Sequence, residues 1–374
     1  MSNELQIINV GSHVNPPAEM WERYCPADLK HLAPKLIRKR FSEETRDAEA
    51  LLLEGVEYRP VGMQMGLPNE PWFAESFGDG TPANREPAER IKAQDQDGVA
   101  AEVIVHPGYP IMLPGNRMAR LGMMYAFNSW LAEFCSYDPS RLIGIGELPM
   151  WDSALAMEEA KRIHGLGLRG ALIPAVPGYE GAWSSPADHP YTSEFYEPIW
   201  QTCNELGLVL VIHPDAYAAT PALQSYDQGP VNIMINKTGA SEIIVSLIVS
   251  GVFERHSGLK LLNVEGGVGW LAHLVPWMDI LFEEHPQLYK DLPKKPSAYY
   301  YDHVYGSFLW DSCGLANRDI IGVENIMWCN DFPHNYGPWP NSRKKIETQL
   351  RGLGEDEKRK ILSENAKALF GLQS

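Results

Sequence analysis

Basic residues are scarce in this sequence relative to acidic ones. The 374 residues include 32 lysines and arginines against 48 aspartates and glutamates, which gives a formal net charge of −16 at pH 7. Such an excess of negative charge repels nucleic acids and anionic membrane surfaces through long-range electrostatics, and no basic patch offsets it. We therefore expect neither a nucleic acid nor a membrane as a partner.

Long apolar runs are also missing from the chain. No run approaches the roughly 18 residues that a transmembrane helix requires. The N-terminal segment MSNELQIINV has neither the basic start nor the apolar centre of a secretory signal. We interpret the protein as cytoplasmic, with a hydrophobic content of 44% that is sufficient for a large core.

Several signatures of cysteine and nucleotide chemistry are absent as well. The five cysteines are odd in number and widely scattered, which fits neither a disulfide framework nor a zinc knuckle. No G-x-S-x-G elbow occurs, and no cysteine lies beside a histidine in a way that suggests a thiol nucleophile. No glycine-rich nucleotide motif follows the first apolar run, which argues against a dinucleotide-binding protein.

Short apolar runs alternate with segments of helical spacing along the chain. This alternation predicts parallel strands joined by right-handed helical crossovers, and eight such units close most naturally into a (β/α)₈ TIM barrel. An open doubly wound sheet is the alternative. The predicted strands cover residues 5–10, 101–106, 142–148, 169–174, 207–213, 259–264, 303–308 and 326–329. The predicted helices cover 86–96, 116–137, 153–164, 192–205, 240–255 and 269–284, with further helices at the C-terminus.

Residues 15–86 form a long insertion after the first strand. The segment is punctuated repeatedly by Gly, Pro and Asn, as in GMQMGLPNEPWF. We expect a single barrel domain spanning residues 1–374. Within it, residues 15–86 and the loop from Ala216 to Val231 would cover the active face as lids, because long loops on barrels are usually functional.

Chemically versatile side chains stand where the predicted strands end. In a closed barrel the carboxyl ends of all strands meet at one rim, so these side chains would converge. They are His13, His106, His213, Glu265 and Asp331. A single histidine at a strand end is more often a hydrogen-bonded rim residue, but this many in one chain favours a shared site.

Two histidines and one carboxylate satisfy a divalent first-row metal ion and leave positions open for water or substrate. His13, His213 and Asp331 fit that set. Asp331 could instead cap the helix that follows it, with His334 as its hydrogen-bonding partner. His106 lies in a turn-like HPGYP segment and is the candidate nearest to a purely structural role.

Four motifs in this order resemble the amidohydrolase-related family: SHVNPP, VIHPD, NVEGGVGW and NDFPH. This branch of the metal-dependent hydrolases includes aminocarboxymuconate semialdehyde decarboxylase and related aromatic acid decarboxylases. The resemblance runs nearly end to end and implies a (β/α)₈ barrel. It also implies metal ligands in an H-x-H pair after strand one, a His after strand five and an Asp after strand eight. These positions correspond to His13, His213 and Asp331.

The sequence departs from that family pattern at several positions. Asn15 replaces the second His of the H-x-H pair, and Glu265 stands where the decarboxylases hold a catalytic His. Many members with an E-x-G-x-G-W motif carry a Glu and an Asp where this chain has Pro16 and Gly11. The resemblance implies a rim site with a divalent ion, Zn, Mn or Fe, and leaves the reaction open.

Three hypotheses follow. The first is a metal-dependent enzyme that hydrolyses or decarboxylates a small carboxylated or acyl substrate. The second is a non-haem iron monooxygenase, mono- or di-iron, acting on an apolar or CoA-linked substrate. The third is a metal-free relative that kept the barrel alone. For the first, we assign metal binding to His13, His213, Glu265 and Asp331, catalysis to Glu265, Asp331 and His334, and substrate contact to His106 and Asn15. The expected partner is a small-molecule substrate, and we allow for a homodimer.

Overall fold

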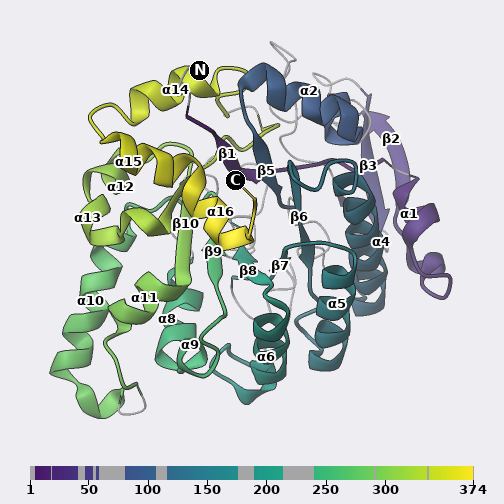
Figure 1. Cartoon of the computed structure of the whole chain (residues 1–374). Helices are drawn as coiled ribbons and strands as arrows, with labels where there is room; N and C mark the ends of the chain where they lie inside the picture. Colours follow the sequence, from purple (N-terminus) through teal and green to yellow (C-terminus); the bar gives the residue numbers. More distant parts are fainter. Residues whose placement is uncertain are drawn as a thin grey trace.

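Eight parallel strands surround a common axis, with helices on the outside (Figure 1). The computed structural model describes residues 5–17, 19–40, 47–53, 56–58, 81–106, 116–175, 189–213, 240–289, 292–334 and 337–373. Among the helices in these ranges, none combines the length and apolar character that crossing a membrane requires.

The strands follow one another around the barrel in the order of the sequence. They are β1 (Ile8–Ser12), β5 (Ala101–Ile104), β6 (Leu142–Glu147), β7 (Gly170–Leu172), β8 (Val209–Ile212), β9 (Leu261–Asn263), β10 (Val304–Phe308) and β11 (Ile326–Trp328). The last strand returns to the first, because His13 N–H donates to Phe332 O at 2.7 Å and Asp331 N–H donates to Gly11 O at 3.1 Å. The predicted eight-stranded barrel is confirmed.

Helices connect successive strands and continue past the last one. They are α2 (Pro87–Asp97), α4 (Arg117–Cys135), α5 (Ser153–Gly165), α6 (Glu197–Leu206), α8 (Ser241–Val249), α9 (Val252–Arg255), α10 (Leu271–Glu284), α11 (Pro296–His303), α12 (Ser312–Ala316), α13 (Arg318–Ile321), α14 (Ser342–Gln349), α15 (Glu355–Arg359) and α16 (Asn365–Phe370). The sequence sets several helix ends. Asp152 accepts from Ala154 N–H at 2.9 Å at the start of α5, and Gly207 ends α6 with φ +66°.

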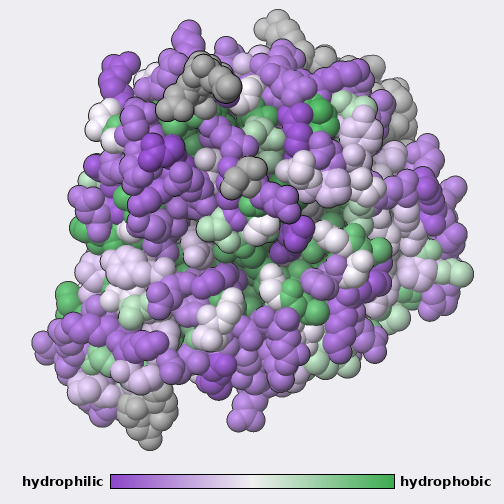
Figure 2. All heavy atoms as spheres, viewed as in Figure 1, coloured by the Kyte–Doolittle hydropathy of each residue, from purple (hydrophilic) through white to green (hydrophobic). Residues whose placement is uncertain are grey.

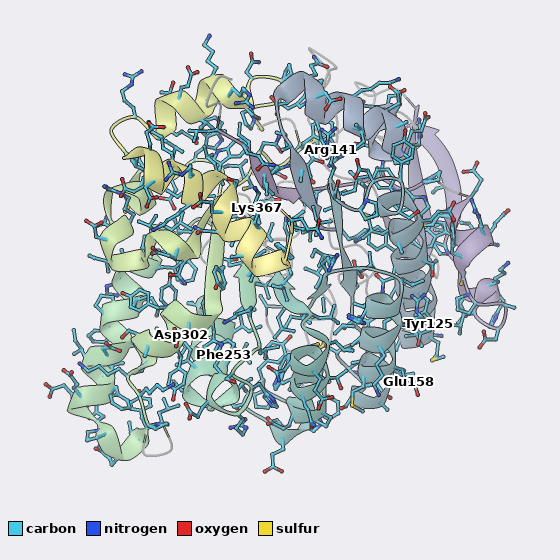
Figure 3. All side chains as sticks on the ribbon, viewed as in Figure 1. Tyr125, Arg141, Glu158, Phe253, Asp302 and Lys367 are labelled. Atoms are coloured by element: carbon cyan, nitrogen blue, oxygen red, sulfur yellow. The ribbon has the colours of Figure 1, made fainter. Side chains whose placement is uncertain are left out.

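The core has two layers, because alternate residues of a parallel strand face opposite sides. One layer fills the barrel interior and includes Ile8, Val10, Val103, Ile143, Ile145, Val211, Leu262 and Met327. The other lies between strands and helices and includes Phe127, Trp200 and Ile244. Tyr125 and Glu158 mark the neighbouring helices α4 and α5 in Figure 3.

The C-terminal helix contributes to the interior layer. Ala366 and Phe370 of α16 pack against the interior cluster, and the helix lies in front of the strands in Figure 1. Figure 2 shows a mostly hydrophilic face in this view, with hydrophobic residues visible mainly near its centre.

The insertion after β1 contains a small antiparallel sheet that the sequence did not predict. Its strands are β2 (Lys35–Arg40), β3 (Asp47–Leu53) and β4 (Val56–Tyr58), preceded by α1 (Met20–Tyr24) and η1 (Lys30–Leu32) and followed by η2 (Pro82–Asn84). Charged residues interrupt the alternation in these strands, as in KLIRKR. Much of the proposed lid, including residues 59–80 and 216–231, lies outside the described residues.

Candidate metal centre

A β-bulge at Gly11 turns His13 toward the barrel interior. Val10 pairs with Val103 and Ser12 pairs with Ile104, so Gly11 is an extra residue on β1. Its φ of +144° suits a glycine. Ser12 Oγ and Asn9 Nδ2 both approach the Glu102 carboxylate, at 3.5 and 3.4 Å, which puts the side chains before and after the bulge on the same outer face. The next residue, His13, therefore faces inward.

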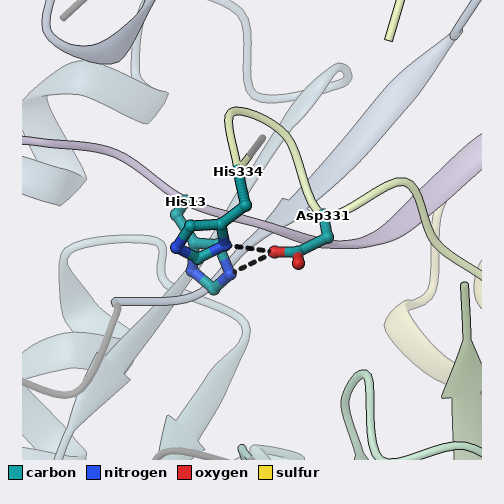
Figure 4. A group of neighbouring side chains, drawn as sticks. All are labelled: His13, Asp331 and His334. Carbon is teal, nitrogen blue, oxygen red and sulfur yellow. Dashed lines mark hydrogen bonds and ion pairs between the residues drawn. The ribbon is translucent and has the colours of Figure 1, made fainter. Parts of the chain in front are cut away.

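His13 is the centre of a buried cluster (Figure 4). Its Nδ1 lies 2.9 Å from the carbonyl oxygen of Val105, which leaves Nε2 to face two carboxylates. Nε2 lies 2.9 Å from Asp331 Oδ1 and 3.1 Å from Glu265 Oε1. Burial alone would lower the pKa of His13, but the two carboxylates outweigh it and raise the pKa to about 10.

Asp331 joins His13 to His334. His334 Nδ1 lies 2.5 Å from the same Asp331 Oδ1 that His13 contacts, and Figure 4 shows both imidazoles directed at this carboxylate. Burial and the charge of Glu265 would raise the pKa of the Asp331 carboxyl, yet the two imidazoles prevail and lower it. The second oxygen, Oδ2, is buried without a hydrogen-bond partner in the described part of the chain.

Glu265 joins His13 to His213. Its Oε2 lies 3.1 Å from His213 Nε2, and the His13 and His213 ring centroids are 5.0 Å apart. Burial would raise the pKa of Glu265, but the two neighbouring imidazoles hold it well below its usual range. Ser307 Oγ accepts a hydrogen bond from Glu265 N–H at 2.8 Å and helps to fix the backbone.

The backbone is left-handed at both carboxylates. Glu265 has φ +58° and Asp331 has φ +55°, and they are the two non-glycine residues with positive φ in the ranges that the structure describes. Non-glycine residues adopt this conformation at a cost, and such residues cluster at functional sites. The strain coincides with the two carboxylates that face His13.

These side chains fit a metal ion. Two overlapping groups place their ligand atoms within 4.8 Å of one another, namely His13, Asp331 and His334, and His13, His213 and Glu265. Both groups share His13, and because its Nδ1 contacts Val105, Nε2 is the ligand atom that remains for a single ion. Imidazole nitrogens with carboxylate oxygens suit a divalent first-row metal, and the unpartnered Asp331 Oδ2 adds a further oxygen.

The structure separates the candidates that the sequence proposed. It brings His13, His213, Glu265, Asp331 and His334 together. His106 is outside this group, because its ring lies against Phe127 with centroids 4.0 Å apart. Asn15 is also outside both ligand groups; it is buried, and its backbone N–H donates to Asn84 O at 3.0 Å. Substrate contact by His106 and Asn15 stays a prediction.

Sequence reasoning missed Glu147, whose carboxylate lies 2.7 Å from His106 Nδ1. The signal was present, because the run LIGIGE ends in a carboxylate just as other strands end in His or Asp. It also missed Arg90, which donates to the carbonyl oxygen of His13 at 2.8 Å. A single arginine in an amphipathic helix carries no comparable signal.

The sequence profile of the amidohydrolase family matches residues 13–372, so the chain belongs to this family. Gamma-resorcylate decarboxylase from Rhodococcus jostii (strain RHA1) is 24% identical over 305 residues, covering 76% of this chain and 87% of that protein. The 2-amino-3-carboxymuconate-6-semialdehyde decarboxylase of Dictyostelium discoideum is 26% identical over 292 residues, covering 77% of each.

A solved structure has the same fold. Dihydroxybenzoic acid decarboxylase from Polaromonas sp. JS666, which contains manganese and the inhibitor 2-nitroresorcinol, superposes with a TM-score of 0.66 at 18% identity. The match covers 99% of this chain and 98% of that one. The predicted family and the predicted class, a metal-dependent hydrolase or lyase, are confirmed. These comparisons give no support to the iron oxygenase alternative.

Proposed function

We propose that this protein decarboxylates a small, unsaturated carboxylic acid of the hydroxybenzoate type. The observation that carries the proposal is the buried cluster around His13, whose Nε2 lies within 3.1 Å of both Glu265 and Asp331 at the strand exits. The three relatives named above support the same reaction, because each is named as a decarboxylase, and two of the names refer to a hydroxylated benzoic acid.

The ligands of one divalent ion would be His13, His213, Glu265 and Asp331. Such an ion supplies Lewis acidity, which polarises the oxygen atoms of a bound acid. Manganese is favoured by the solved relative, with zinc and iron as alternatives. Glu265 and Asp331 neutralise the charge of the ion, and His334, 2.5 Å from Asp331, is placed to exchange a proton with that carboxylate.

The shared use of His13 Nε2 argues against a di-iron centre, because one imidazole nitrogen binds one ion. The buried, strained carboxylates argue against a metal-free relative, since no hydrogen-bond partner among the described residues offsets the cost of burying Asp331 Oδ2. We propose decarboxylation rather than hydrolysis because the two similar proteins are both named as decarboxylases.

Product analysis tests the proposal. Manganese-loaded protein would be incubated with a panel of hydroxybenzoates labelled with ¹³C in the carboxylate, and with acyl esters and amides as competitors. We expect labelled CO₂ from at least one benzoate, loss of this activity with a chelator, and its recovery on adding manganese. Hydrolysis of an acyl substrate without CO₂ release from any benzoate would overturn the proposal.

We further propose a cytoplasmic, single-domain enzyme that forms a homodimer. The dimer proposal is supported by exposed apolar side chains on helices that pack side by side, α10, α11 and α13. They are Trp277, Ile280, Tyr301 and Ile320, each at least 41% exposed. Light scattering on the purified protein tests the assembly.

We also propose that residues 15–86 and the loop from Ala216 to Val231 cover the active face of the barrel as lids.

A further inference from the structure

Glu147 is a buried carboxylate at the mouth of the barrel that the metal centre does not use. It ends β6, two residues beyond Ile145 and four beyond Ile143, which both belong to the interior cluster. Because strand side chains alternate, Glu147 shares their inward face. Its exposed fraction is 0%.

The surroundings of Glu147 fix its position and leave part of the carboxylate unsatisfied. The Asn128 side chain brackets its backbone, donating to Glu147 O at 3.0 Å and accepting from Glu147 N–H at 2.8 Å. His106 Nδ1 lies 2.7 Å from Oε1. In the described part of the chain, Oε2 has no hydrogen-bond partner. A buried carboxylate oxygen without a partner is costly, and its retention points to a function.

The pair formed by His106 and Glu147 lies next to the metal centre. Val105 accepts from His13 Nδ1 at 2.9 Å, and the following residue is His106. The segment that follows β5 therefore contacts His13 through Val105 and Glu147 through His106. Since β5 separates β1 from β6, and adjacent strands are about 4.8 Å apart, the ligand strand and the Glu147 strand are roughly 10 Å apart. A single aromatic ring with its carboxylate fits such a span.

We propose that Glu147 and His106 form an acid–base dyad that protonates the substrate carbon from which CO₂ leaves; this rests on the proposed function. The bond from that carbon to the carboxylate breaks, and its electron pair stays on the carbon. The carbon takes a proton from the dyad, CO₂ departs, and the dyad recovers a proton from water. No oxidant or reductant is needed. Glu265 and Asp331 are less suited, because their oxygens face His13 and the ion site.

The test compares Glu147→Gln with a matched control, Glu159→Gln. Glu159 is also buried and contacts the same Asn128 side chain at 2.6 Å, but it lies on α5 and pairs with Arg162. We expect Glu147→Gln to lower kcat by about 100-fold or more, the usual weight of an acid–base group, while manganese content and KM stay near wild type. Glu159→Gln should keep its kcat even if its thermal stability falls.

His106→Gln provides the second variant if Glu147→Gln fails to fold, and the same loss of kcat is expected. A Glu147→Gln or His106→Gln enzyme that keeps wild-type kcat would overturn the dyad while leaving decarboxylation intact. Loss of manganese in Glu147→Gln would also overturn it, because the residue would then be a ligand. A wild-type enzyme that releases no CO₂ would instead refute the proposed function together with the dyad.

Discussion

Gly11 makes room for the carboxylate that faces His13. A Cβ atom added at this position would lie 2.8 Å from Glu265 Oε1 and 3.0 Å from Val264 Cγ1. Its φ of +144° also excludes most side chains. The glycine thus has two independent roles, forming the bulge that turns His13 inward and admitting Glu265 beside it.

Gly11→Ala is therefore expected to displace Glu265 and to weaken manganese binding by about tenfold or more, equivalent to about 1.4 kcal/mol. Titration against a fluorescent chelator measures the change. Gly167→Ala is the control, since Gly167 also has a positive φ, +89°, but nothing lies within 4 Å of an added Cβ. The control should lose stability through backbone strain alone and bind manganese normally. Normal binding by Gly11→Ala would contradict this role.

Metal binding should release a proton from His13. With a pKa of about 10 in the metal-free cluster, His13 carries a proton between Glu265 and Asp331 at pH 7. The proton must leave before Nε2 can bind an ion. Below a pH of about 10 the small deprotonated fraction of His13 rises about tenfold per pH unit, so the apparent affinity should increase by the same factor. Calorimetry in two buffers of different ionisation enthalpy counts the released protons. Identical heats in both buffers would refute this prediction.

At the scale of elements, a buried polar network ties α2 to the first and last strands. Arg90 of α2 pairs with Glu102 of β5 at 2.6 Å and donates to His13 O at 2.8 Å. Its guanidinium lies 4.4 Å from the ring centroid of Phe332, which follows Asp331. Arg90 therefore holds the backbone beside two of the proposed ligands.

Replacing Glu102 with Gln would leave Arg90 buried without a counter-charge. We expect a loss of about 3–5 kcal/mol in the free energy of unfolding, together with weaker manganese binding. The comparison is Glu133→Gln, which breaks an exposed pair with Arg23 whose side chains are 52% and 65% accessible. That variant should be nearly as stable as wild type. Urea unfolding distinguishes the two, and equal stability of both variants would argue against the network.

The strands of the barrel could be predicted from sequence because each is a short apolar run buried on both faces, as in Val209–Ile212. The convergence of His13, His213, Glu265 and Asp331 followed from the barrel alone. The small sheet could not be predicted, because KLIRKR lacks a regular apolar alternation. The bulge at Gly11 and the pairing of His106 with Glu147 depend on register and side-chain direction, which a single sequence does not specify.

At the scale of the whole molecule, the proposed metal centre can form only when the barrel closes. His13 and Asp331 are 318 positions apart, yet their side chains lie 2.9 Å from each other because β11 returns to β1. Folding thus brings the proposed ligands together, and an ion bound to the native state should stabilise it against unfolding.

The central claim is that the cluster binds one divalent ion, and elemental analysis of the purified protein tests it most directly. Wild-type protein exchanged into manganese should contain about one ion per chain, and His213→Ala should contain almost none although it stays folded, because the ring removed contacts Glu265 at 3.1 Å in the cluster. A wild-type protein that is fully active without any bound metal, or one that binds two ions per chain, would contradict the account.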